Sequence, residues 1–195
     1  MSMTTNEIFM DARVAHVREL KAEVARLREE LSRTRDELAS LRSHFALALE
    51  AARDADALPP GARLLVVDGW NAVLGSVSVI PPSERRGGSD ELEEALCRRV
   101  RAWLAVHPSD AAWIVFDGSE AGGRAEPRLR ISYTGGSGAH RADRMVCDYL
   151  RMRRLSGASH NVIVATQDKD FRREALSLGA EVINVDEICN CENMR

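Results

Sequence analysis

The chain has 195 residues, of which 45% are hydrophobic and 29% are charged, and its formal net charge is -3. This composition predicts a folded core, excludes wholesale disorder and gives no overall basic field for attracting nucleic acid. No apolar run approaches the roughly 20 residues that cross a bilayer, and the first ten residues carry no secretory signal. We therefore expect a soluble, cytoplasmic protein whose four cysteines are free thiols.

The first predicted element is a coiled-coil helix over residues 8–51. Apolar side chains recur there in alternating steps of three and four, the a and d positions of a heptad. The g positions carry acids and the e positions carry bases, so a parallel dimer would pair Glu23 with Arg28, Glu30 with Arg35 and Glu37 with Arg42. Antiparallel pairing would oppose like charges, so the pattern predicts a parallel homodimer. The alternative is a single amphipathic helix folded back on the domain.

A linker and an α/β domain are predicted to follow. Residues 52–62 include Pro59-Pro60, which cannot continue a helix, and we expect them to form the linker. Within residues 63–195, strands are predicted at 64–67, 112–116, 162–165 and 181–185, with a weaker candidate at 129–133. Helices are predicted at 90–106, 142–155 and 171–178. The alternation predicts a doubly wound α/β domain with a mostly parallel sheet.

Aspartates follow three of the predicted strands, Asp68 and Asp117 directly and Asp168 after Thr166 and Gln167. The carboxyl ends of parallel strands line one crevice, and Asp143, at the start of the helix after a glycine-rich loop, should face it too. Carboxylates confined together repel unless they bind protons or a cation, and Mg²⁺ or Mn²⁺ fits an all-oxygen site best. Asn71 is a candidate for orienting a water or a phosphate. The alternative role for Asp143 and Asp168 is helix N-capping.

Basic residues accompany the predicted acidic site. Residues 120–154 contain eight arginines against four acidic residues, although the chain as a whole is slightly acidic. Arginine and lysine beside an acidic metal centre favour a polyanionic substrate. The candidates for substrate contact are Arg141, Arg144, Lys169 and Arg172. For the arginines at 151, 153 and 154, a solvated helix face is an equally good explanation.

Four short motifs resemble those of a known family. Residues 65–71 (LVVDGWN) are similar to the first-strand motif of NYN domains, especially the YacP-like branch, in the PIN-like nuclease superfamily. Residues 115–118, 133–144 and 164–170 resemble the next three acidic motifs in the same order, and the resemblance spans residues 63–188. Two positions depart from the pattern: Trp70 replaces the usual tyrosine, and Arg144 stands where the family often has a second acidic residue.

The resemblance implies a PIN-like fold and a Mg²⁺- or Mn²⁺-dependent endoribonuclease that acts on mRNA, rRNA or tRNA, including RNA in a ribosome context. It implies a catalytic, metal-binding set supported by Asn71, with Asp170 as an extra candidate; the set is Asp68, Asp117, Asp143 and Asp168. We therefore predict a hydrolytic endoribonuclease in residues 63–195. The alternative, favoured by Arg144 and the acidic net charge, is a catalytically weak RNA-binding adaptor that assembles through its coiled coil. A small-molecule phosphatase is disfavoured, because Asp68 lacks a second aspartate two residues on.

Overall fold

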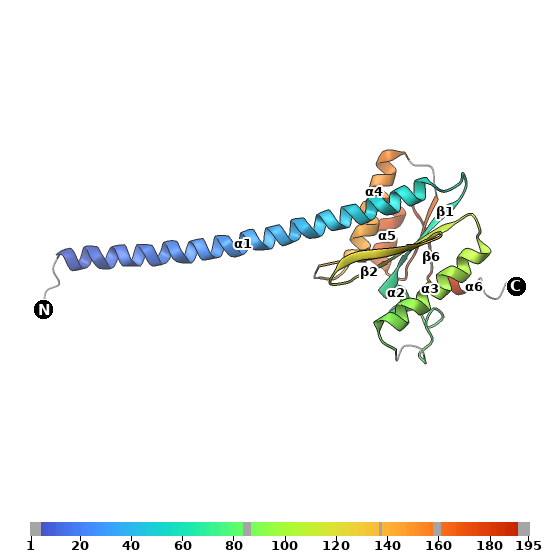
Figure 1. Ribbon diagram of the computed structural model, residues 1–195, viewed down its shortest axis with the longest axis horizontal. Helices are drawn as coiled ribbons and strands as arrows, with labels where there is room; N and C mark the ends of the chain where they lie inside the picture. The colour runs from blue at the N-terminus through green and yellow to red at the C-terminus, as the bar shows by residue number, and fades with distance from the viewer. Residues whose placement is uncertain (1–4, 84–86, 137, 158–160, 191–195) are drawn as a thin grey trace. The chain divides into compact units, whose positions relative to one another are not determined.

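The computed structural model of the protein describes residues 5–83, 87–136, 138–157 and 161–190 (Figure 1). The chain forms two compact units, Met1–Leu41 and Arg42–Arg195. Helix α1 (Thr5–Asp56) accounts for the described part of the first unit and ends within the second. It contains no proline or glycine, so nothing in its backbone interrupts the hydrogen-bond ladder. No helix in the described ranges is long and apolar enough to span a membrane.

The second unit is built on a six-stranded sheet in the order β3-β4-β2-β1-β5-β6. Every neighbouring pair of strands is parallel except β3 and β4, which form an antiparallel pair at one edge. The strands are β1 (Arg63–Asp68), β2 (Ala111–Phe116), β3 (Ala121–Glu126), β4 (Leu129–Thr134), β5 (Asn161–Ala165) and β6 (Glu181–Ile183). The predicted mostly parallel sheet is therefore confirmed.

Helices cover both faces of this sheet, with α4 and α5 on one side and α3 on the other (Figure 1). Along β1, Leu65 and Val67 pack towards α2 and α3, whereas Leu64 and Val66 pack towards α4 and α5. Strands covered on both faces need apolar residues at successive positions, which explains the continuous apolar runs in the sequence. The helices are α2 (Gly69–Gly75), α3 (Ser89–Val106), α4 (Arg141–Ser156), α5 (Lys169–Ser177) and α6 (Glu187–Asn190). The result is an α/β fold preceded by a long helix.

The last turns of α1 belong to the second unit and are not a linker. Ala48, Ala51 and Ala55 are buried in the core with α4 and the sheet. Arg130 on β4 binds Glu50 at 2.7 Å and Asp54 at 2.5 Å. We expected the linker to begin at residue 52, but the helix continues to Asp56. Alanine favours helix, and its small side chain lets the helix axis approach the sheet closely.

Candidate active site

The four predicted acids meet at one edge of the sheet. Asp68, Asp117, Asp143 and Asp168 all line one open cavity of about 470 Å³. They converge because β1 lies between β2 and β5, so the carboxyl ends of these three strands are adjacent. The rest of the lining is Trp70, Asn71, Leu74, Gly75, Ala139 and His140.

Asp68 is partly buried at the junction of β1 and α2. It ends β1 and caps α2, where its Oδ1 accepts a hydrogen bond of 3.3 Å from the backbone N–H of Asn71. Burial, and after it the negative charge of Asp143, raises the pKa of Asp68 from 3.8 to about 8. The ionised form of Asp68 is therefore costly in this position unless a positive charge accompanies it.

Asp143 lies in the first turn of α4, and its two carboxylate oxygens have different surroundings. Oδ2 lies 3.1 Å from Nδ1 of His140, the residue that precedes the helix. Oδ1 is buried and has no fixed hydrogen-bond donor within the described residues. The side-chain contact with Asp68, which helps to raise the pKa of Asp68, can supply a donor only while Asp68 holds a proton. A buried carboxylate oxygen without a hydrogen-bond partner is unfavourable, and binding of a proton or a cation would stabilise it.

Asp117 follows β2 directly and is held by the start of α4. Its Oδ1 accepts hydrogen bonds from the backbone N–H of Ala142 at 2.8 Å and from the hydroxyl of Thr134 at 3.3 Å. Nε of Arg141 lies 3.9 Å from the same oxygen. The positive end of the α4 dipole and the Arg141 guanidinium therefore both face this oxygen.

Asp168 caps α5, the alternative considered from the sequence. Its Oδ1 accepts hydrogen bonds from the backbone N–H groups of Asp170 at 2.8 Å and Phe171 at 2.9 Å. A carboxylate has two oxygens, so capping through one leaves the other able to meet a ligand in the cavity. Oδ1 of Asn71 accepts a hydrogen bond of 3.2 Å from the backbone N–H of Gln167, which ties α2 to the loop before Asp168.

This donor set suits a hard divalent cation better than a soft one. It consists of carboxylates, and the cavity offers neither a thiol nor a pair of histidines. Within the described residues, no group of three or more Asp, Glu, His or Cys side chains is placed so that it could hold a metal ion.

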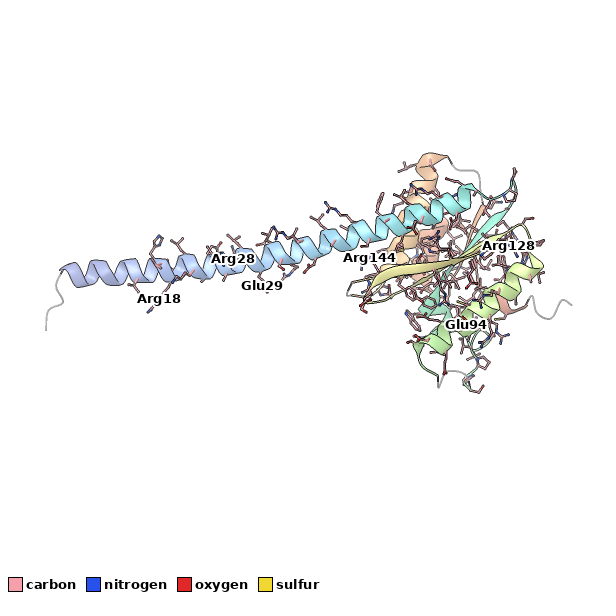
Figure 2. The ribbon with its side chains drawn as sticks, in the orientation of Figure 1. Arg18, Arg28, Glu29, Glu94, Arg128 and Arg144 are labelled. Atoms are coloured by element: carbon pink, nitrogen blue, oxygen red, sulfur yellow. The ribbon has the colours of Figure 1, made fainter. Side chains whose placement is uncertain are left out.

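The predicted substrate-contact residues differ in their accessibility. Arg141 is buried, and its guanidinium donates to Thr134 Oγ1 at 3.1 Å, to the Gly118 carbonyl at 2.9 Å and to the Gly138 carbonyl. Arg141 therefore holds the loops around Asp117, and its donors are engaged within the protein. In contrast, Arg144 (Figure 2), Lys169 and Arg172 are exposed.

Much of the arginine cluster between residues 120 and 154 has structural partners. Arg128 donates to the carbonyls of Leu104, His107, Pro108 and Asp110. Arg151 pairs with Asp148 and Glu174, and Arg153 is buried beside Asp56. The excess of arginine in the sequence therefore reflects folding as well as any role at the site.

Among the lining residues that were not assigned to the site from the sequence, Trp70 and His140 have rings with polar atoms. Trp70 donates from its indole N–H to the carbonyl of Asp117 at 2.8 Å, and its ring meets Phe116 edge-on at 5.1 Å. His140 has a left-handed backbone, with φ of 60°, which places it at the start of α4 beside Asp143. The sequence signals were the aromatic within the 65–71 motif and the histidine within the glycine-rich 133–144 motif.

Comparison with known proteins gives a limited result. No protein-family model matches the chain, and no curated protein matches its sequence. Two crystal structures of Rae1 (YacP) from Bacillus subtilis, one of them a mutant form, are similar to it. The mutant form matches with 19% identity and a TM-score of 0.49, covering 67% of this chain and 76% of that one. The other matches with 16% identity and a TM-score of 0.48, covering 67% and 75%. Values this low carry no functional conclusion.

Proposed function

We propose that this protein is a metal-dependent endoribonuclease that hydrolyses RNA phosphodiester bonds at the aspartate-lined cavity. The observation that carries the proposal is the buried Oδ1 of Asp143, which has no fixed hydrogen-bond donor in the described residues. Asp143 lies in the same cavity as Asp117 and Asp68. The pKa of Asp68 is raised, so a nearby positive charge would stabilise the ionised form of that side chain. One divalent cation would stabilise both the buried Oδ1 of Asp143 and the ionised form of Asp68.

Asp68, Asp117 and Asp143 are the proposed ligands for Mg²⁺ or Mn²⁺, and Asp168 adds a carboxylate to the same cavity. When bound, such a cation lowers the pKa of a water ligand and stabilises the leaving oxygen of a phosphodiester. The chain's own contribution is to hold these carboxylates in place. Asn71 does so by joining α2 to the loop before Asp168, and Arg141 by fixing the loops around Asp117.

RNA is the proposed substrate because of the sequence motifs and the accessible cations. Arg144, Lys169 and Arg172 are exposed and follow closely on the acids at 143 and 168, where they can contact phosphates that flank the cleaved bond. The choice of RNA, with ribosome-associated RNA among the candidates, comes from the resemblance of residues 65–71 and the three later motifs to NYN domains. An open cavity suits an internal stretch of chain better than a closed pocket would.

The decisive experiment compares Asp143→Asn with Asp170→Asn. Asp170 is in the first turn of the neighbouring helix α5, but its side chain is 90% exposed, pairs with Arg173 and lies outside the cavity lining. A circular single-stranded RNA is incubated with the full chain in Mg²⁺, Mn²⁺ or EDTA, because only an endonuclease can open a circle. We expect metal-dependent opening by the wild type and Asp170→Asn, and loss of at least about a hundredfold in Asp143→Asn.

The same preparation distinguishes the adaptor alternative. RNA binding is measured alongside cleavage by fluorescence anisotropy, and the set of substrates includes structured RNA and ribosomes. Binding without metal-dependent cleavage of any substrate would refute the endoribonuclease and favour the catalytically weak adaptor. Equal cleavage by the wild type and Asp143→Asn would refute the assigned site.

A further inference from the structure

One face of helix α1 carries a long apolar stripe in the first unit, with a single polar position at Thr34. At alternating steps of three and four residues, its large side chains are each between 46% and 57% exposed. The stripe consists of Val17, Leu20, Val24, Leu27, Leu31, Leu38 and Leu41, with Thr34 at the remaining position. These eight positions span about 37 Å of helix. Monomeric proteins rarely leave a contiguous apolar surface of this kind in water.

Thr34 interrupts the stripe in sequence but carries no unsatisfied hydrogen-bond donor. Its hydroxyl donates to the carbonyl of Glu30 in its own helix at 3.0 Å. The polar end of Thr34 is thereby satisfied, and its methyl group remains available for an apolar contact. The stripe can therefore continue across this position at little cost in desolvation.

Charged residues flank the stripe in a pattern that specifies its partner. Glu23 and Glu30 run along one side, and Arg28 and Arg35 along the other. Glu23 pairs with Arg26 of its own helix at 2.7 Å, whereas in the described part of the chain Glu30, Arg28 and Arg35 form no ion pair. Figure 2 shows Arg28 projecting from the helix. Unpaired charges of opposite sign beside an apolar stripe are what a second, identical helix would complement.

We propose that this face, over residues 17–41, binds a second copy of the chain as a parallel, in-register coiled coil. In that arrangement Glu23 meets Arg28 of the other copy, and Glu30 meets Arg35. An antiparallel arrangement would oppose acids to acids and bases to bases, which disfavours it. Apolar a and d positions sustained over more than three heptads are enough to support a dimer. The inference is independent of the proposed nuclease activity.

Charge-exchange variants of the full chain test the partner. Glu23→Arg/Glu30→Arg and Arg28→Glu/Arg35→Glu each make all four cross-helix contacts repulsive, whereas a mixture of the two makes them attractive again. The matched control is Glu29→Arg/Arg33→Glu, which exchanges a pair at 3.6 Å within one helix, away from the stripe. Mass is measured by sedimentation equilibrium at micromolar concentration. We expect dimers for the wild type and control, dimerisation weaker by at least about tenfold for each charge variant, and dimers for the mixture.

Cysteine cross-linking tests the orientation in a protein whose charges are unchanged. In a parallel, in-register dimer the two copies of residue 20 face each other, so Leu20→Cys forms an intermolecular disulfide on oxidation. Ala22→Cys, on the outer side of the helix, is the control and should not. A monomeric wild type, or a charge variant as dimeric as the control, would overturn the proposal. A dimer in which Leu20→Cys fails to cross-link would overturn the parallel register.

Discussion

The indole N–H of Trp70 donates a hydrogen bond of 2.8 Å to the main-chain carbonyl of Asp117. It connects α2, which follows β1, to the residue that follows β2, and so links the strand ends that carry two of the acids. Trp70 also rests edge-on against Phe116, the last residue of β2. Tryptophan is thus better suited here than an aromatic without a ring donor, because it both packs and fixes the backbone of Asp117.

Trp70→Phe keeps the aromatic packing and removes only the donor. We expect a loss of about 1 kcal/mol in the free energy of unfolding, with RNA cleavage reduced on the order of tenfold because Asp117 is less well positioned. Trp103→Phe, in α3 and outside the cavity lining, is the control for the loss of an indole. Denaturant unfolding and initial cleavage rates are measured for both. Equal cleavage by the two variants would show that the Trp70 hydrogen bond does not position the site.

The raised pKa of Asp68 makes the metal-free protein sensitive to pH. Because the folded pKa of about 8 exceeds the ordinary 3.8, the folded protein holds a proton that the unfolded chain releases between these values. The stability from this group is complete below the ordinary pKa and is lost as pH rises through the folded pKa. In EDTA, Asp68→Asn should therefore be more stable than the wild type at pH 8.5, with a smaller difference at pH 5.

Added Mn²⁺ should reverse that order. Binding to the folded state alone stabilises it, so the wild type should gain stability with metal, while Asp68→Asn gains less because it lacks a ligand. Urea unfolding at the two pH values, with and without Mn²⁺, measures all four cases. A wild type that is more stable than Asp68→Asn at pH 8.5 in EDTA would contradict the raised pKa.

The parts of the fold that the sequence predicted are those with local causes. β1, β2 and β5 are continuous apolar runs, and each aspartate that follows them could be assigned to one sheet edge. β3 was missed because its sequence, AGGRAE, is exposed and rich in glycine, and it is a strand only through its pairing with β4. The burial of Arg141 could not be predicted from the sequence either, because its acceptors lie at the end of β4, at Thr134, and in loops at residues 118 and 138.

The burial of the last turns of α1 in the core of the second unit could not be predicted from local sequence either, and it gives a further prediction. Removal of residues 1–41 should leave the second unit folded, because its core residues on α1 begin at Ala48. Removal of residues 1–56 takes away Ala48, Ala51 and Ala55 and both partners of Arg130, and should destabilise the domain by about 3 kcal/mol or more. Thermal unfolding of the two truncated proteins measures this difference in stability. Similar melting temperatures would mean that residues 42–56 are only a linker.

Arg141 and Arg144 should separate the positioning role from the substrate-binding role. Arg141→Lys cannot serve three acceptors arranged around a guanidinium, so stability should fall by about 2 kcal/mol and cleavage should fall with it. Arg144→Gln changes an exposed side chain whose carbonyl partners at residues 139 and 140 can bond to water instead. Its stability should stay within about 0.5 kcal/mol of the wild type, while RNA binding weakens and loses roughly one phosphate contact from its salt dependence.

Binding is measured by anisotropy over a range of salt concentrations in the Asp143→Asn background, so that RNA stays intact, and stability by urea unfolding. If Arg141→Lys reduced the salt dependence of binding without loss of stability, Arg141 would be a phosphate contact after all. If Arg144→Gln left RNA affinity unchanged at every salt concentration, the RNA path would have to be sought at Lys169 and Arg172, because these are the remaining exposed cations assigned to the site.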